Sequence, residues 1–313
     1  AYEICHCLVG SEMCIRASLR EALALPNAPT LFIPFCGAGG RLTVNDIHYV
    51  VEGDTATPAH LTPFARDKFF PFSHSYLPDY IAEKAGGAVD VQSISLEQLR
   101  SGDITAELAA LPDGCTCIIN ATSRKDLDVL SHALYQSERQ FIFRSAASFV
   151  QSFAGITSRP PLESWQMQDL DPNPNGGLIV VGSLDSKTSD QLADLLENAP
   201  DAVVMELDVP SLVSGETPEL PLHETIASGK TVILHTSRER IEVDDNLALS
   251  ETVSKALVAL VKSVKARPSF IIATGGMTAS EIATQALGIK NARVLGQILP
   301  GVPVWTMGNE TRH

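Results

Sequence analysis

The chain alternates between short apolar runs and stretches in which apolar residues recur every three or four positions. The apolar runs predict strands at 30–35, 115–121, 140–144, 177–182, 202–207, 231–236, 269–273 and 292–296. The wider spacing predicts amphipathic helices at 125–136, 186–198, 246–262 and 278–287. Strands that alternate with helices favour βαβ units, so we expect an α/β fold with mostly parallel sheets flanked by helices.

A stretch rich in proline, glycine and asparagine interrupts this alternation between residues 155 and 176. It predicts two lobes, 18–157 and 177–313, joined by a linker at 158–176. The segment 36–80 has scattered aromatic, proline and histidine residues and few clear periods. This lack of regular periodicity favours an irregular β region over an insertion that carries an active site.

The first seventeen residues fit neither pattern. The run CLVGSEMCI at 7–15 resembles a peptide produced when sequencing-adapter DNA is translated. We therefore treat residues 1–17 as doubtful and expect the homologous sequence to start near Ser18.

Composition and charge narrow the classes of protein and partner. A hydrophobic content of 44% without compositional bias is typical of a soluble globular protein. The formal net charge of −14 argues against nucleic-acid and anionic-membrane partners, because a negative field repels both. No run is long enough to span a bilayer and no signal-peptide pattern opens the chain, so a cytoplasmic location is the default expectation.

Two of the six cysteines, Cys115 and Cys117, lie in a predicted buried strand with their thiols on the same face. A zinc site would need two more ligands, and none is suitably spaced. Core packing is therefore the favoured interpretation, and no metal ligand is assigned.

The strongest candidate for chemistry is the turn that follows the apolar run 269–273. Gly275 and Gly276 permit positive φ and close backbone approach, and Thr278 stands where a helix N-cap belongs. A strand that ends in such a turn before a helix can hold phosphate oxygens. For Gly-Gly-x-Thr alone, an ordinary strand-to-helix turn is an equally good interpretation.

An NAD-dependent dehydrogenase would carry a three-glycine fingerprint, and the absence of that fingerprint counts against this class of enzyme.

Two further strand ends in the same lobe follow this logic. Ser183 and Lys187 follow one strand, and Ser237 follows another. Taken singly, such residues are more often capping serines and solvated lysines. Three polar strand ends together are where an open α/β sheet binds its ligand, so they raise the expectation of a nucleotide site.

Several segments resemble the four-carbon acid sugar kinase family, in order along the chain. They are 39–44 (GGRLTV), 48–50 (HYV), 64–67 (FARD), 143–150 (FRSAASFV), 181–183 (VGS), 187–188 (KT), 236–238 (TSR), 275–278 (GGMT) and 295–305 (LGQILPGVPVW). The resemblance covers nearly everything after residue 30. It implies a kinase that phosphorylates acids such as threonate, erythronate or 3-oxo-tetronate, with ATP in the second lobe and the sugar acid between the lobes.

The resemblance places nucleotide contacts at Ser183 and at the turn 275–278, with Lys187 and Ser237 as further candidates. Many members have an acidic residue at the third position of that turn, where this chain has Met277. If that side chain orients Mg²⁺ or ribose in relatives, this chain must do so differently. Backbone contacts would survive the change.

For the sugar acid, the carboxylate-binding candidates are Arg41 and, more weakly, Arg66, since a guanidinium can bind both oxygens. His48 and Asp67 could line the same site. Surface ion pairs and a structural histidine are the competing interpretations of these residues.

Two family features do not occur in the sequence: an early Asp-Asp-x-Thr-Gly motif and a final glycine-rich turn. We therefore expect a fragment of a parent kinase and name no catalytic base. The parent would transfer the γ-phosphoryl group of ATP, with Mg²⁺, to a sugar-acid hydroxyl. The alternative is a nucleotide-binding fragment or binding module without transfer activity. The identity of the acid and a homo-oligomeric state are left open.

Overall fold

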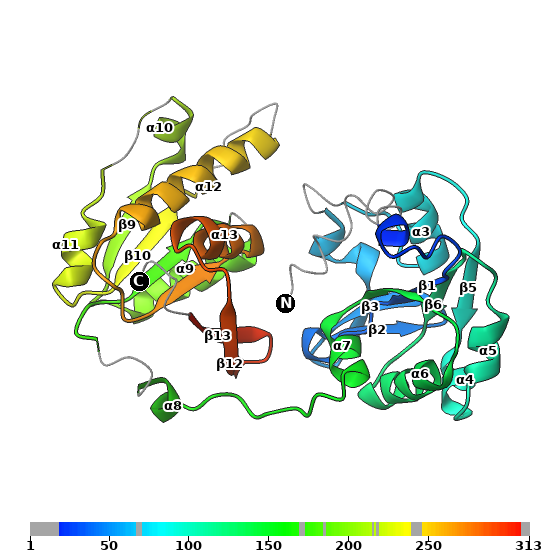
Figure 1. Cartoon of the computed structure of the whole chain (residues 1–313). Helices are drawn as coiled ribbons and strands as arrows, with labels where there is room; N and C mark the ends of the chain where they lie inside the picture. The colour runs from blue at the N-terminus through cyan, green and yellow to red at the C-terminus, as the bar shows by residue number, and fades with distance from the viewer. Residues whose placement is uncertain are drawn as a thin grey trace. The chain divides into compact units, whose positions relative to one another are not determined.

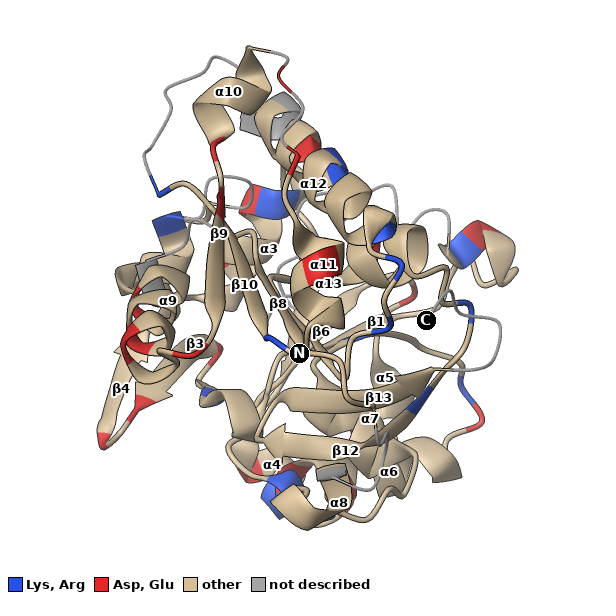
Figure 2. Ribbon diagram, turned by 90° about the vertical axis from the view of Figure 1, so that its left-hand side faces the viewer, with Lys and Arg blue, Asp and Glu red and all other residues tan. Residues whose placement is uncertain are grey.

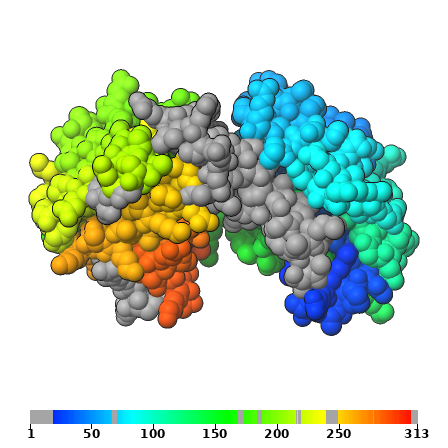
Figure 3. Space-filling model, turned by 90° about the horizontal axis from the view of Figure 1, so that it is seen from above, coloured from blue at the N-terminus to red at the C-terminus, as the bar shows by residue number. Residues whose placement is uncertain are grey.

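The computed structural model describes residues 19–66, 71–168, 173–183, 186–214, 216, 219–238 and 246–307. The chain divides near residue 160 into two compact units (Figure 1), and each has a hydrophobic core of its own. In the space-filling view each unit is a packed body (Figure 3). We describe them one at a time.

The first unit is built on a parallel sheet with the strand order β5-β6-β1-β7. The strands are β1 (Thr30–Ile33), β5 (Val91–Ile94), β6 (Thr116–Ile119) and β7 (Ile142–Ser145), and the helices are α3 (Leu77–Ala85), α4 (Leu96–Arg100), α5 (Thr105–Ala110), α6 (Arg124–Gln136) and α7 (Ala147–Phe153). Alternate residues of β1 face opposite sides: Leu31 packs with α4 to α7, whereas Phe32 packs with α3. Both faces are thus covered, as expected for buried parallel strands.

Cys115 and Cys117 are fully buried in this core, which confirms the packing interpretation. Burial raises the pKa of the Cys117 thiol to about 12. The thiol therefore stays protonated and acts as an apolar group at neutral pH.

An antiparallel sheet of three strands adjoins the parallel one, in the segment expected to be an irregular β region. Its strands are β2 (Arg41–Val44), β3 (Ile47–Glu52) and β4 (Thr55–Pro58), and the short 3-10 helices η1 (Gly37–Gly39), η2 (Ala59–Leu61) and η3 (Pro63–Arg66) flank it. The β2–β3 turn uses Asn45 and Asp46 with φ of 50° and 61°. Such left-handed residues match the twist of a tight hairpin.

The second unit contains another parallel sheet, with the order β11-β8-β10-β9. The strands are β8 (Leu178–Val181), β9 (Val203–Leu207), β10 (Val232–Thr236) and β11 (Ile271–Thr274), and the helices are α8 (Ser164–Gln168), α9 (Ser186–Asn198), α10 (Val209–Val213), α11 (Leu222–Ala227), α12 (Asn246–Ser263) and α13 (Gly276–Glu281), followed by one π-helical turn, η4 (Ile282–Ala286). Helix α9 packs on one face through Leu192, and α12 packs on the other through Leu257 and Val261.

The last two strands, β12 (Ala292–Leu299) and β13 (Val302–Met307), form a separate two-stranded sheet joined by a turn at Gly301 with φ of 84° (Figure 1). The apolar run 292–296 is thus a strand, but it is not part of the parallel sheet. With this exception the expected α/β fold with mostly parallel sheets flanked by helices is confirmed.

Candidate functional site

Three strand ends meet at one edge of the sheet of the second unit. Strands β8, β10 and β11 are parallel, and β8 lies between the other two. Their carboxyl ends therefore fall at the same edge, which is where open α/β sheets bind ligands. The residues that follow these strands are Gly182 and Ser183 after β8, Ser237 and Arg238 after β10, and Gly275 and Gly276 after β11.

The glycine turn has the backbone geometry that the sequence predicted, but with a different cap. Gly275 has φ of 92° and ψ of 127°, a conformation that side chains disfavour, and it is the N-cap of α13. The prediction of Thr278 as the cap was wrong, because the helix begins two residues earlier and places Thr278 in its first turn.

Thr278 instead contacts the neighbouring strand end. A Cβ atom added at Gly182 would lie 2.7 Å from Thr278 Oγ1 and 2.9 Å from Leu257 Cδ1. The glycine at 182 thus allows α13 to approach the end of β8. Thr274 pairs with Val181 in the parallel register, so the turns that begin at Gly275 and Gly182 leave neighbouring strand ends.

Arg238 ties the end of β10 to the turn between β8 and α9. Its Nη1 donates to the carbonyl oxygen of Ser183 at 2.7 Å, and its Nη2 donates to Ser189 Oγ at 2.8 Å. The sequence had singled out the strand end that contains Arg238, without assigning this residue to the site. The feature of the sequence that could have identified Arg238 is its position as a polar residue just after a buried strand.

Ser237 has a different role at this edge. Its side chain is buried, and its Oγ accepts a hydrogen bond from the Val209 N–H at 3.0 Å, at the start of α10. The hydroxyl therefore anchors the β9–α10 connection, and its assignment to the nucleotide stays a prediction. Lys187 lies in the first turn of α9 and Met277 in the first turn of α13, but their side chains are outside the described part of the structure.

In the first unit, Arg41 and His48 lie on the same face of the antiparallel sheet. Thr43 pairs with His48 in the β2–β3 register, so Arg41, two residues before Thr43, shares their face. The Arg41 guanidinium stacks on the Phe64 ring, with 4.3 Å from Cζ to the ring centroid. Arg66 ends η3 and is exposed, whereas Asp67 falls outside the described residues.

His48 is held as a neutral side chain. Its Nδ1 lies 3.0 Å from Thr43 Oγ1, and its backbone N–H donates to the Ser75 carbonyl oxygen. Burial, followed by repulsion from the Arg41 guanidinium, lowers the pKa of His48 to about 4. At neutral pH the positive charge on this face therefore comes from Arg41.

Two buried contacts position this face. Asn120, at the end of β6, donates to Asp46 Oδ1 at 2.7 Å and accepts the Asp46 N–H at 2.9 Å, which fastens the β2–β3 turn to the parallel sheet. At the start of β2, Gly40 has φ of 62°, and a side chain there would collide with the Val51 carbonyl oxygen. The position of Arg41 thus depends on a glycine and on a buried amide.

Arg144 packs against aromatic side chains within the first unit. Its Cζ lies 4.4 Å from the centroid of the Phe32 ring, and its Nη2 donates to Tyr80 Oη at 3.3 Å. These contacts link β7 to β1 and α3.

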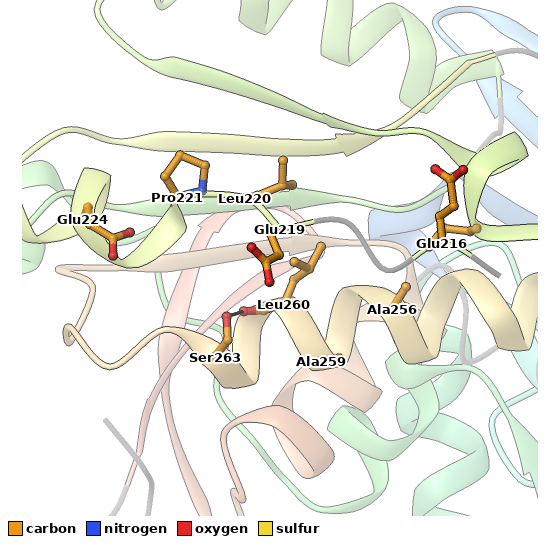
Figure 4. A pocket seen from close by; sticks show the side chains of 10 residues that line it. Glu216, Glu219, Leu220, Pro221, Glu224, Ala256, Ala259, Leu260 and Ser263 are labelled. Carbon is orange, nitrogen blue, oxygen red and sulfur yellow. Dashed lines mark hydrogen bonds between the residues drawn. The ribbon is translucent and has the colours of Figure 1, made fainter.

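The second unit also has a pocket of about 730 Å³ between the α10–α11 segment and α12 (Figure 4). Its lining includes the acidic side chains of Glu216, Glu219 and Glu224 and the apolar side chains of Leu220 and Leu260. An acidic rim disfavours a polyphosphate. None of the candidate residues lines this pocket, so the strand-end edge is the better nucleotide site.

Acidic residues occur on several elements of the second unit, including α9, α11 and α12 (Figure 2).

Among the described residues, no group of three or more histidine, cysteine, aspartate or glutamate side chains is placed to hold a metal ion. Within the same ranges, no helix has the length and apolar character needed to cross a membrane.

Comparisons with known proteins identify both units. Residues 13–153 match the model of a sugar-binding N-terminal domain, and residues 178–313 match the model of a nucleotide-binding C-terminal domain. No curated protein sequence matched the chain significantly.

Two crystal structures share the fold. A Salmonella typhimurium LT2 protein, provisionally named a tRNA synthase, is 18% identical with a TM-score of 0.61, over 95% of this chain and 71% of that one. A Haemophilus influenzae protein of the DUF1537 family is 17% identical with a TM-score of 0.53, over 94% of this chain and 70% of that one. The paired sugar-binding and nucleotide-binding domains, in this order and on this fold, show that the chain belongs to the four-carbon acid sugar kinase family.

Proposed function

We propose that this protein is an ATP-dependent kinase that transfers the γ-phosphoryl group to a hydroxyl of a four-carbon sugar acid. The observation that carries the proposal is the meeting of the three strand ends in the nucleotide-binding domain. There, Thr278 contacts Gly182, and the turns that follow Thr274 and Val181 leave neighbouring strands. We assign the nucleotide to 177–313 and the sugar acid to 18–157.

In this reaction the hydroxyl oxygen of the acid forms a bond to the γ-phosphorus, and the bond from that phosphorus to the ADP oxygen breaks. The backbone at Gly275 and Gly276, together with Ser183, would hold phosphate oxygens. Mg²⁺ would arrive with ATP and neutralise the charge that develops on the phosphates. No residue is assigned as the acceptor of the hydroxyl proton.

The carboxylate of the acid is assigned to Arg41, because its guanidinium lies on a strand face, fixed by stacking on Phe64. A guanidinium held in one orientation suits a carboxylate, because two of its N–H groups can donate parallel hydrogen bonds to the two carboxylate oxygens. Arg66 is exposed at the end of η3 and is the weaker candidate.

The test is calorimetric titration with ATP, paired with phosphorylation assays on threonate, erythronate and 3-oxo-tetronate. Binding with Mg²⁺-dependent turnover of one acid supports the kinase. Binding without turnover of any acid supports a nucleotide-binding module. Absence of ATP binding in a folded sample refutes the proposal.

Arg41→Lys keeps the charge but removes the planar fork. We expect it to raise KM for the sugar acid about tenfold, equivalent to about 1.4 kcal/mol, and to leave KM for ATP unchanged. Arg66→Lys should have the smaller effect. A larger effect of Arg66→Lys would move the carboxylate to that residue.

A further inference from the structure

Three polar atoms at the candidate nucleotide site lack the hydrogen bonds that buried groups normally make. Within the described part of the second unit, the buried side-chain atoms without a hydrogen-bond partner are Thr236 Oγ1, Arg238 Nε and Thr274 Oγ1. Thr236 ends β10, Thr274 ends β11, and Arg238 follows β10 by two residues. All three therefore lie at the carboxyl edge of the sheet, and none lies elsewhere in the described second unit.

Such atoms are rare in folded proteins, because an unsatisfied buried donor or acceptor destabilises the fold. Their gathering at one edge indicates that this edge binds a polar partner. The partner must be able to accept hydrogen bonds, since Arg238 only donates.

Within the described ranges, the charge of Arg238 is not compensated by an acidic side chain. Its guanidinium donates to two neutral oxygens, those of Ser183 and Ser189, and no described carboxylate forms an ion pair with it. Desolvation is the cause that lowers the pKa of Arg238. A partly buried cation without a counterion costs free energy, which a bound anion would offset.

We propose that Arg238 is a phosphate-binding residue of the nucleotide site: its guanidinium, held beside the Ser183 turn, serves as the counterion of the polyphosphate. The proposal rests on the nucleotide site assigned above and adds the group that the site recognises. Because the rest of the protein is acidic, a local cation is needed to draw a polyphosphate to this edge.

Substituting Arg238 would have different effects if the residue only held the Ser183 turn than if it were the counterion of the phosphates. A clamp would lower stability when removed and would weaken all nucleotides alike. A counterion acts on the phosphates alone, and its removal takes away a partly buried charge that no described carboxylate pairs with. The affinities of ATP, AMP and adenosine, read beside the melting temperature, separate the two roles.

The experiment compares wild type, Arg238→Met and Lys255→Met by calorimetry and thermal unfolding. Lys255 is a matched control, because it is an exposed cation of α12 in the same unit. For Arg238→Met we expect ATP affinity to fall at least tenfold, AMP affinity to fall less, adenosine affinity to stay unchanged, and Tm to stay equal or rise. Lys255→Met should bind all three as wild type does. Unchanged ATP affinity in Arg238→Met, or an equal loss for ATP and adenosine, overturns the proposal.

Two further measurements keep the inference testable if Arg238→Met does not fold. Arg238→Lys keeps the charge and loses the fork, so it should bind ATP more weakly than wild type while adenosine is unaffected. Inorganic tripolyphosphate should raise the Tm of wild type, and the increase should shrink with added salt. No increase in Tm overturns the proposal. An increase with tripolyphosphate, but no binding of ATP, would refute the kinase assignment and leave the anion site standing.

Discussion

Acidification tests the environment of His48 directly. In the folded protein, burial and the Arg41 guanidinium lower the pKa of this imidazole to about 4, from an ordinary value of 6.5. The difference between these values corresponds to about 3 kcal/mol at ~1.4 kcal/mol per pH unit. Because the unfolded chain takes up this proton near pH 6.5 and the folded protein only near pH 4, the unfolded state binds more protons between these values. The free energy of unfolding should therefore decrease as the pH falls from 6.5 towards 4, and His48 should contribute no pH dependence above that range.

The assay combines two readouts. NMR titration of the His48 imidazole gives its pKa in the folded protein, and urea unfolding at pH 7, 6, 5 and 4.5 gives the stability. Unfolding should be followed by far-UV circular dichroism, because both tryptophans, Trp165 and Trp305, lie in the second unit and report on it alone.

The variant His48→Gln should lose most of the acid-dependent decrease in stability. His74→Gln is the control, since His74 is exposed in the same unit and its removal should leave the decrease in place. An imidazole pKa of 6 or higher in the folded protein would refute the reasoning. So would an equal pH dependence of wild type and His48→Gln.

Two substitutions test the contacts that position the sites. Gly182→Ala places a methyl group 2.7 Å from Thr278 Oγ1, so we expect ATP affinity to fall about tenfold, or ~1.4 kcal/mol, with secondary structure retained by circular dichroism. Gly87→Ala is its control, because a Cβ there meets nothing within 4 Å, and equal affinities of the two variants would count against the contact. Asn120→Leu leaves Asp46 without its buried donor and should destabilise the first unit by about 2–4 kcal/mol in urea unfolding. A loss below about 1 kcal/mol would show that the turn does not depend on this amide.

The parallel strands could be predicted because both of their faces are buried. Strands β6 and β8 are buried at every position, so they appear in the sequence as continuous apolar runs. Strands β2, β3 and β4 are short and only partly buried, and β3 shows no regular alternation of buried and exposed positions. Their pairing depends on a tight turn and on a buried amide from a distant strand, which no local pattern displays.

The candidate nucleotide site was predictable as a set of strand ends but not as a set of contacts. The order of polar residues after apolar runs placed Ser183, Ser237 and the glycine turn at one edge, because parallel strands share an edge. The sequence did not indicate that Ser237 anchors α10 or that Arg238 reaches α9, since both contacts depend on where helices from other parts of the chain end. The cap of α13 was misplaced because glycine and threonine are both acceptable N-caps.

The placement of Arg41 and His48 on paired strands also constrains how the first domain can change in evolution. Only alternate residues of β2 and β3 reach this face, so exchanging them alters what the face recognises while the backbone path is preserved. If this face binds the acid as proposed, point mutations of these residues change acid specificity. Inserting a single residue into β2 would instead turn Arg41 and Thr43 to the opposite side of the sheet in one step.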